Sequence, residues 1–522
     1  MIWFALPVIE GGHNMFAKAK SLGLFGMDSF SVIVEADLSN GLPRFDIVGL
    51  PDAAVKESRE RVRASIKNCR FDFPVARITV NIAPADVRKE GPIYDLPIAI
   101  ALLKAAKQIN GSIDDYAFVG ELSLDGEVRA CNGVLPMLLK AREENIGAVF
   151  VPFENQTEAS VVNGIDVFPV KNIFEVIRHI SGEKLITPCY KPAELLETVD
   201  EMLDFADVKG QHNAKRALEI AAAGGHNCLL IGPPGTGKSM LAKRLPSILP
   251  QMSFDEQLET TKLYSIAGEL PDGVQLITKR PFRSPHHTVS AQGLTGGGHN
   301  PRPGEISLAH NGVMFMDEFP EFDRRAKESL RQPLEDGVIT ITRTGGSVSY
   351  PSNLMVVAAM NPCPCGYLGH PTRECICTDA SKKRYRDRIS GPILDRIDLH
   401  IEVEPVDYEK LSSESKEETS AEIRKRVNRA REIQRERFKG TGISCNAKMT
   451  PKMTKEYCVL SDEASSLLKM SFERLGLSAR AYDKILRIAR TAADLDESEN
   501  IEFAHVAEAI QYRSLDRKYW GE

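Results

Sequence analysis

The chain has 522 residues, a length that allows about three or four domains. Its 42% hydrophobic and 26% charged residues are typical of a globular protein, and its net charge of -6 argues against a uniformly basic coat for nucleic acid, though not against a local basic channel. No stretch approaches the roughly 18 uncharged apolar residues of a membrane span, and ten cysteines are too sparse for a disulfide scaffold.

The chain begins with an apolar segment, residues 2–9, that is too short to span a membrane. No basic flank precedes it, so we expect no signal peptide. Residues 1–14 show no clear pattern, which makes Met15 a candidate for the native start.

An α/β pattern extends from residue 15 to about residue 180. It predicts strands at 31–36, 77–82 and 148–151, helices at 51–68, 96–106 and 135–144, and a hairpin at 122–128. This region has no phosphate-binding loop of its own. We assign residues 1–180 to a first domain and residues 181–203, with Pro188, Pro192 and scattered charge, to a linker.

The sequence LLIGPPGTGKS, Leu229 to Ser239, fits the phosphate-loop pattern G-x-x-x-x-G-K-[ST]. An apolar run suited to a buried parallel strand precedes it, and a stretch suited to a helix follows it. Glycines let successive backbone N–H groups turn onto phosphate oxygens, and the helix N-terminus adds positive potential. The residues expected to bind the nucleotide are Gly232, Pro233, Pro234, Gly235, Thr236, Gly237, Lys238, Ser239 and Met240.

Within this loop, Lys238 can reach the β- and γ-phosphates and the Ser239 hydroxyl can hold Mg²⁺. Downstream, the apolar run of NGVMFMDE ends in two acids. Asp317 is placed to bind Mg²⁺ and Glu318 to polarise the attacking water. The alternative for the glycine motif is a chance Gly-rich turn, and the alternative for the Asp-Glu pair is a plain αβ loop. Both are disfavoured because the strand, the helix and the two acids occur in the expected order.

Three further polar residues stand at positions that need explanation. Asn361 ends the apolar strand 354–360, although a lone Asn there is usually a turn residue. Arg396 lies between acids in GPILDRIDLH, where a local salt bridge is the alternative. Arg480 falls in the first turn of an amphipathic helix, 477–495, with Ser478 as N-cap, a place that disfavours a cation. That misplacement hints at function.

Four long motifs resemble magnesium-chelatase-like AAA+ ATPases: FRSPHHT from Phe282, GGGHNPRPGEISLAHNGVMFMDE from Gly296, EDGVITITR from Glu335 and SGPILDRIDL from Ser390. The resemblance implies roles for the three polar residues. Asn361 would be sensor 1, Arg396 the finger that reaches the neighbouring subunit's γ-phosphate, and Arg480 sensor 2 of the lid. It also implies that Phe205–Gln211 contacts the adenine.

The first domain resembles the proteolytic domain of Lon proteases over Lys89–Leu102 and Leu122–Asn155. Ile93 stands where those proteases have their serine, and the segment matching their lysine carries Leu135 and Met137 but no lysine. A Ser–Lys mechanism cannot run without a hydroxyl and a base. We therefore expect a Lon-like α+β fold without the dyad, with a structural or partner-docking role.

The combination of a Lon-like domain with a magnesium-chelatase-like AAA+ ATPase resembles the domain organisation of the ComM/YifB family. The resemblance implies an α/β multidomain chain: a Lon-like domain (1–180), a linker (181–203), an AAA+ core with pore-hairpin inserts and a four-cysteine loop (204–405) and a helical lid (406–522). It implies a cytoplasmic homo-hexameric ring ATPase that uses ATP and Mg²⁺. The expected activity is branch migration or helicase action on branched or single-stranded DNA. Recombination proteins are the expected partners, as in natural transformation. No membrane partner is expected.

Two inserts are candidates for the pore. One covers residues 283–310, and the other, VITITRTGGSVSY from Val338, predicts a hairpin turning at Gly345-Gly346. The DNA-contact candidates are Arg283, His286, His287 and Arg343. Packing between subunits is an equally weighted alternative for both inserts.

Cys363, Cys365, Cys375 and Cys377 form the pattern C-x-C-x₉-C-x-C directly after Asn361. Four thiolates on one short loop suit a structural tetrahedral Zn²⁺. A disulfide pair is the alternative, disfavoured in a reducing compartment.

Three rival functions share these motifs. A metal-insertion ATPase of the chelatase type has every ATP motif, but the Lon-like region argues against it. A protein remodeller would use the pore on polypeptide. An ATP-dependent protease is disfavoured by Ile93 and the missing lysine.

Overall fold

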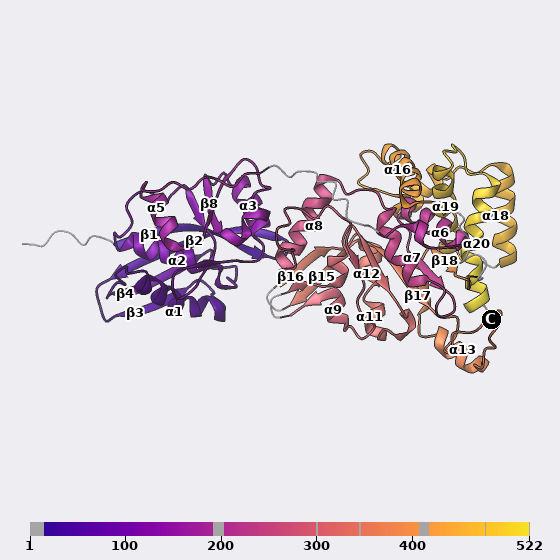
Figure 1. The fold of residues 1–522 in the computed structure, drawn as a ribbon, viewed down its shortest axis with the longest axis horizontal. Coiled ribbons are helices and arrows are strands. Elements are labelled where there is room, and N and C mark those ends of the chain that lie inside the picture. Colours follow the sequence, from indigo (N-terminus) through magenta and orange to yellow (C-terminus); the bar gives the residue numbers. More distant parts are fainter. Residues whose placement is uncertain are drawn as a thin grey trace, which may run out of the picture. The chain divides into compact units, whose positions relative to one another are not determined.

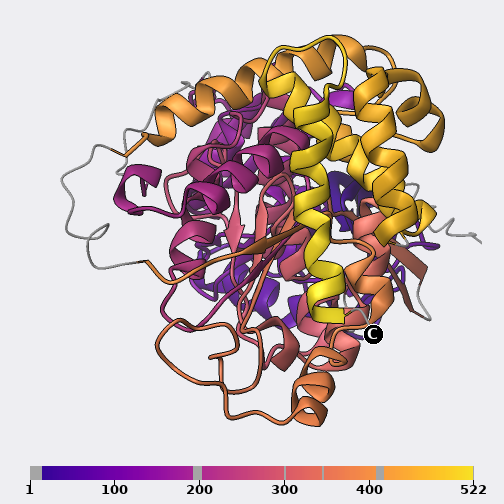
Figure 2. The ribbon, with the colours of Figure 1, turned by 90° about the vertical axis from the view of Figure 1, so that its right-hand side faces the viewer.

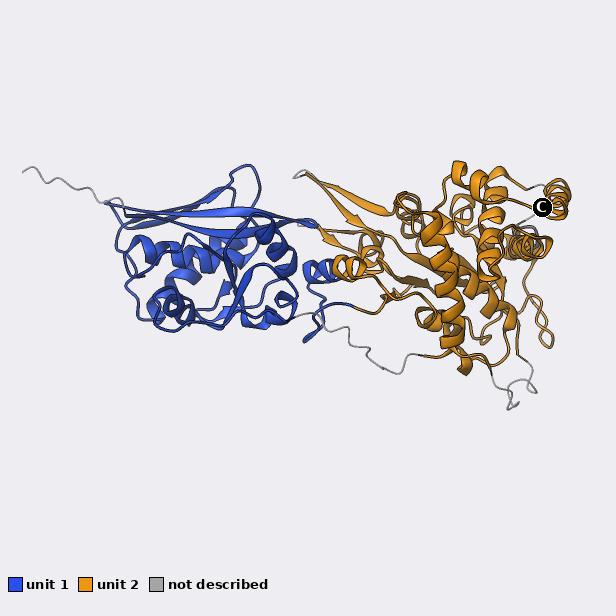
Figure 3. Cartoon of the chain, turned by 90° about the horizontal axis from the view of Figure 1, so that it is seen from above, with its two compact units in different colours: residues 1–195, 261–277 blue, residues 196–260, 278–522 orange. Residues whose placement is uncertain are grey.

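A computed structural model describes residues 15–191, 203–298, 301–343, 346–406, 417–475 and 477–520. The chain divides into two compact units (Figure 3). Unit 1 comprises residues 1–195 and 261–277, and unit 2 comprises residues 196–260 and 278–522. Within the described residues, no helix is both long and apolar enough to cross a membrane.

Unit 1 is built on a seven-stranded mixed sheet in the order β3-β4-β2-β1-β5-β8-β9. Its strands are β1 (Met15–Phe25), β2 (Asp28–Ser39), β3 (Arg44–Val48), β4 (Arg77–Ala83), β5 (Tyr116–Phe118), β8 (Ala148–Pro152) and β9 (Asp166–Val170). Buried residues alternate along β2 and β4, as expected for a sheet with one covered face. The strands predicted at 31–36, 77–82 and 148–151 are confirmed.

The main helices of unit 1 are α1 (Ala53–Asn68), α2 (Asp95–Ala105), α3 (Val134–Glu143) and α5 (Ile173–Ile180) (Figure 1), and α4 (Gln156–Ala159) is a single short turn. The short pair β6 (Glu121–Leu122) and β7 (Val128–Arg129) forms the predicted hairpin. Helix α2 is buried along nearly its whole length. Ile93 and Met137 are also buried. The residue expected to stand at the Lon serine position, and Met137 in the segment expected to carry the Lon lysine, are therefore buried apolar side chains.

The segment 261–277 groups with unit 1 although the residues before and after it belong to unit 2. Its Ser265 carbonyl accepts a hydrogen bond from the Gly133 N–H at 3.0 Å. The Ser265 hydroxyl donates to the buried Glu158 carboxylate at 2.6 Å. Burial raises the pKa of Glu158. These contacts explain why a segment far along the sequence completes the first unit.

Unit 2 contains a five-stranded parallel sheet in the order β11-β14-β17-β10-β18. The strands are β11 (Phe282–Arg283), β14 (Val313–Met316), β17 (Met355–Met360), β10 (Cys228–Ile231) and β18 (Leu399–Glu402). The three central strands are entirely buried, as in sheets covered on both faces. Parallel pairing brings the loops after β10, β14 and β17 to one edge.

Helices α6 (His212–Gly224) and α7 (Lys238–Arg244) pack on β18 and β17 respectively. The C-terminal helices lie together along one side of the unit (Figure 2). They are α16 (Ser420–Arg437), α18 (Asp462–Leu475), α19 (Ala479–Leu495) and α20 (Phe503–Trp520). Ser478 caps α19 as predicted, its side chain accepting from the Ala481 N–H.

The predicted hairpin is present as β15 (Val338–Arg343) and β16 (Gly346–Pro351). Arg343 pairs with Gly346, so Gly346 belongs to the second strand rather than to the turn in which the sequence placed it. Gly345 and the Arg343 side chain lie outside the described residues.

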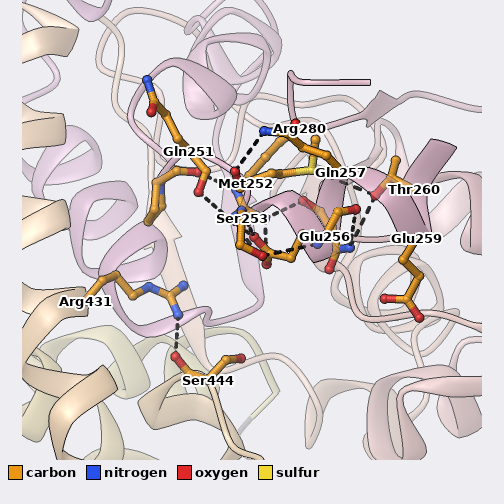
Figure 4. A network of polar contacts seen from close by, with 12 residues as sticks. Gln251, Met252, Ser253, Glu256, Gln257, Glu259, Thr260, Arg280, Arg431 and Ser444 are labelled. Carbon is orange, nitrogen blue, oxygen red and sulfur yellow. Dashed lines mark hydrogen bonds and ion pairs between the residues drawn. The ribbon is translucent and has the colours of Figure 1, made fainter. Parts of the chain in front are cut away.

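Arg280 joins the start of α8 (Phe254–Ala267) to the segment before β14 (Figure 4). Its guanidinium donates to the carbonyls of Pro250 at 2.6 Å and Asn311 at 2.7 Å, and to the Glu256 carboxylate at 3.2 Å. Burial lowers the Arg280 pKa from its usual range, while Glu256 opposes that effect. The side chain is 15% exposed, so this network is largely removed from water.

Candidate functional site

The loop between β10 and α7 has the shape of a phosphate cradle. Gly235 and Gly237 have φ values of +80° and +89°, which residues with a Cβ rarely adopt. A Cβ at either position would meet nothing within 4 Å. Inside the loop, the Thr236 hydroxyl donates to the Pro233 carbonyl at 3.0 Å. The glycines therefore hold the backbone open to a ligand.

Lys238 is the first residue of α7, and its ammonium is turned onto the loop. Its Nζ donates to the carbonyls of Gly232 at 2.6 Å and Pro233 at 2.8 Å, and to Asn361 Oδ1 at 3.2 Å. Burial lowers the pKa of Lys238 to about 8, and the nearby Asp317 opposes the shift. A phosphate group in the loop would stabilise the charged form that burial disfavours.

Ser239 and Asp317 lie together although 78 residues separate them: the Ser239 hydroxyl donates to Asp317 Oδ2 at 2.7 Å. A hydroxyl and a carboxylate are hard oxygen donors of the kind that Mg²⁺ accepts beside a nucleotide. The donor set therefore fits Mg²⁺.

Glu318 follows Asp317 with a left-handed φ of +52°. Its side chain is 57% exposed and lies 3.4 Å from His287 Nδ1. The carboxylate is thus partly open to solvent, on a backbone conformation that residues with a Cβ rarely adopt.

Asn361 reaches the loop because β17 lies directly beside β10. Ile231 is paired with Met360, and the Gly232 N–H donates to the Met360 carbonyl at 3.2 Å. Gly232, which follows β10, and Asn361, which follows β17, are therefore neighbours. The four residues predicted separately from sequence form two hydrogen-bonded pairs, Lys238 with Asn361 and Ser239 with Asp317, which meet at the adjacent residues 238 and 239.

Arg396 and Arg480 make their contacts elsewhere. Arg396 donates to the Pro392 carbonyl at 2.6 Å and to the Glu335 carboxylate, and its side chain is 12% exposed. Arg480, 72% exposed, pairs with Asp395 at 3.0 Å. Asp395 directly precedes Arg396 in the chain, so Arg480 is paired with the residue next to Arg396. Among the described contacts neither arginine touches the phosphate loop.

A cavity of about 320 Å³ opens near the phosphate loop. Gln211 lines it and donates from Nε2 to the carbonyls of Thr236 at 3.2 Å and Glu404 at 2.6 Å. The sequence predicted an adenine contact by Phe205–Gln211 but not that Tyr512 and Leu515 of α20 would line the same cavity. No motif marks those two residues, which are some 300 positions away.

The DNA-contact candidates have different surroundings. Arg283 forms a bidentate pair with Glu305, both distances being 2.7 Å. The rings of His286 and His287 are 4.1 Å apart between centroids. Arg343 is the last residue of β15. Arg283 is thus engaged within the insert, whereas Arg343 stands at the end of a hairpin.

The four cysteines of the loop after Asn361 form a compact cluster. All four sulfur atoms lie within 4.8 Å of one another, and among the described residues this is the one group of three or more Cys, His, Asp or Glu side chains so arranged. None of the ten cysteines forms a disulfide. The predicted disulfide alternative is not observed here.

Comparison with known proteins matches three family descriptions to this chain. "Magnesium chelatase, subunit ChlI" covers residues 204–411, "Subunit ChlI of Mg-chelatase" covers 34–155 and "Magnesium chelatase, subunit ChlI C-terminal" covers 417–513. The competence protein ComM of Haemophilus influenzae is 43% identical over 94% of this chain and 96% of its own length. The uncharacterized protein YifB of Salmonella typhimurium is also 43% identical, over 94% and 96%. A Lon protease of Mycolicibacterium smegmatis is 29% identical over 30% of this chain and 22% of its own length.

Proposed function

Because the chain belongs to the ComM/YifB family of magnesium-chelatase-like AAA+ ATPases, we propose that it is a homo-hexameric, Mg²⁺-dependent ring ATPase that moves DNA. The proposed activity is branch migration or helicase action during homologous recombination and natural transformation, in the cytoplasm and beside recombination proteins. The proposed domains remain 1–180, 181–203, 204–405 and 406–522.

The convergence of Lys238, Ser239, Asp317 and Asn361 at one edge of the parallel sheet carries the ATPase part of the proposal. Lys238 would exchange its carbonyl partners for phosphate oxygens, and Ser239 with Asp317 would hold Mg²⁺. Bound Mg²⁺ neutralises charge on the phosphates. Glu318 would orient the attacking water and accept its proton, and Asn361 would help to place that water.

The ring part of the proposal follows from Arg396 and Arg480. Among the described residues both are paired with carboxylates of their own chain, and neither contacts that chain's phosphate loop. Arg396 would leave its partner to reach the γ-phosphate of an adjacent subunit, and Arg480 would act as sensor 2 of the lid. An arginine finger can be worth about 10³ to 10⁵ in rate. Mass photometry with and without a non-hydrolysable ATP analogue tests assembly. A chain that stays monomeric with nucleotide contradicts this part.

The DNA part is supported by the similarity to ComM, which is named as a competence protein, and by the hairpin β15–β16, whose first strand ends in Arg343. Hydrolysis should be measured with a Holliday-type junction, with single-stranded DNA and with unfolded protein. We expect stimulation by DNA. Stimulation by unfolded protein alone would identify a protein remodeller instead.

Glu318→Gln tests the catalytic base. The variant should bind ATP normally and lose turnover by at least about 100-fold, because an amide cannot accept the proton. Glu321→Gln, in the short segment that follows the Asp-Glu pair, is a matched control and should retain turnover. Wild-type turnover in Glu318→Gln would refute the assignment.

A chelatase motor is the second candidate, since all three matched family descriptions name that subunit. One of them covers residues 34–155, so the first domain by itself does not separate the two functions. Stimulation of hydrolysis by a porphyrin and a partner subunit, with no response to DNA, would favour metal insertion. The proposed cofactors are ATP and Mg²⁺, and the four-cysteine cluster is proposed to hold Zn²⁺.

A further inference from the structure

The cluster of Cys363, Cys365, Cys375 and Cys377 has the dimensions of a metal-thiolate site. The measured Sγ–Sγ distances are 3.4 Å for Cys363–Cys365, 3.6 Å for Cys363–Cys375 and 3.7 Å for Cys365–Cys375. Four sulfurs at about 2.3 Å from one Zn²⁺ stand about 3.8 Å apart along the edges of a tetrahedron. A disulfide needs about 2.05 Å. The geometry therefore fits one tetrahedral ion and not two disulfides.

The ligand chemistry also favours Zn²⁺. A site with four thiolates and no oxygen ligand suits Zn²⁺ rather than Mg²⁺ or Ca²⁺. Cys363 is fully buried. The Cys365 N–H donates to the Cys377 sulfur at 3.4 Å, a hydrogen bond of the kind that stabilises a thiolate ligand. Such a closed set of four protein ligands is typical of a structural rather than a catalytic site.

The loop that carries the cluster lies against the phosphate loop. Gly366 has a φ of +84°, and a Cβ there would stand 2.7 Å from Cδ of Pro234. At its other end the loop starts at Asn361, whose Oδ1 accepts the hydrogen bond from Lys238 Nζ. Only Pro362 separates Asn361 from Cys363. Movement of the cluster would therefore displace both Asn361 and the surface on which Pro234 rests.

We propose that one Zn²⁺ bound by Cys363, Cys365, Cys375 and Cys377 fixes this loop on the phosphate loop and thereby holds Asn361 for ATP hydrolysis. The hydrolytic consequence rests on the proposed ATPase function, whereas metal binding does not. Without the ion, only weak hydrogen bonds to sulfur tie the two C-x-C pairs together, so Asn361 would be held less firmly while the glycine cradle would still admit nucleotide.

Metal content tests the site directly. Full-length chain purified under reducing conditions should contain about one Zn²⁺ per chain. Cys375→Ser/Cys377→Ser should contain none, and Cys189→Ser, outside the cluster, should keep it. Co²⁺ bound in place of Zn²⁺ should give the visible ligand-field and thiolate charge-transfer bands of a tetrahedral thiolate site. Folded wild-type chain that binds neither ion overturns the proposal.

A pair of glycine variants tests the coupling without touching the ligands. Gly366 and Gly369 both have positive φ, +84° and +79°, but a Cβ at Gly369 would meet nothing within 4 Å. Gly366→Ala should keep its metal and lose about 10-fold or more in kcat, whereas Gly369→Ala should lose far less. Equal kcat in the two variants overturns the coupling. A wild-type chain that binds Zn²⁺ but hydrolyses no ATP would refute the ATPase function and leave the metal site standing.

Discussion

Arg396, the proposed finger, is held by Glu335 of its own chain, immediately before the hairpin β15–β16. The arginine is 12% exposed and the glutamate 57%. To reach a neighbour's γ-phosphate, Arg396 must leave Glu335. Engagement of the finger would therefore release Glu335, which lies at the end of α12 just before the hairpin proposed to touch DNA.

Two variants should have opposite effects on turnover. Arg396→Ala should lower kcat by about 10³-fold with nucleotide binding unchanged, because it removes a positive charge that stabilises the transition state. Glu335→Ala should raise kcat by up to about 5-fold, since an ion pair whose carboxylate lies at the surface is worth about 1 kcal/mol and competes for the finger. Steady-state ATPase assays check both, with Arg429→Ala as a control for a surface ion pair of the C-terminal helices. A loss of turnover in Glu335→Ala would show that the glutamate positions the finger.

Nucleotide affinity should depend on pH through Lys238. Its pKa in the free chain is lowered to about 8 by burial, and bound phosphate favours the protonated form. Below pH 8 the lysine is charged before binding, so affinity is constant. Above pH 8 binding must take up a proton, and the nucleotide Kd should rise about tenfold per pH unit.

Titration with a fluorescent nucleotide between about pH 7 and pH 9.5 measures this dependence on both sides of the lysine pKa. Lys238→Ala has no group that takes up the proton and should bind weakly with a flat profile. An equally steep profile in that variant would assign the dependence to another group.

Arg280 should stabilise the start of α8. Arg280→Ala leaves Glu256 and the carbonyls of Pro250 and Asn311 without their donor. Because the network is largely buried, we expect local opening of residues 254–260 to become easier by about 2 kcal/mol, or about 30-fold faster amide hydrogen exchange. Arg331→Ala, which breaks a more exposed pair with Glu328, should change exchange by less than about 1 kcal/mol.

The sequence predicts those features of the site that depend on only a few adjacent residues. The glycines of the phosphate loop, the acids after β14 and the cap of α19 each depend on a few adjacent residues, and the structure has them where the pattern puts them. The convergence of Ser239 with Asp317 depends on the strand order of the sheet, which no local sequence pattern gives.

Contacts between distant segments were not predictable in this way. Glu335 was assigned no role, because its pairing with Arg396 depends on how α12 (Arg331–Asp336) meets the segment before β18. Tyr512 and Leu515 carry no motif, and only the packing of α20 brings them to the cavity near Gln211. Segment 261–277 joins unit 1 through Ser265, a residue type with no diagnostic pattern.

DNA affinity should separate Arg343 from Arg283. Arg343 ends β15 at the hairpin, whereas Arg283 already donates twice to Glu305. If Arg343 binds a phosphate, Arg343→Ala should weaken binding for all sequences alike and reduce the slope of log K against log salt by about 0.7 to 0.9 for each phosphate that the arginine neutralises. Arg283→Ala should leave that slope unchanged.

Fluorescence anisotropy with single-stranded and junction DNA over a range of salt concentrations measures the slope for both variants. Arg343→Lys should keep most of the slope because it keeps the charge. The same reduction of slope in Arg283→Ala would mean that its pair with Glu305 opens on DNA. An unchanged slope in Arg343→Ala would instead support packing of the hairpin between subunits.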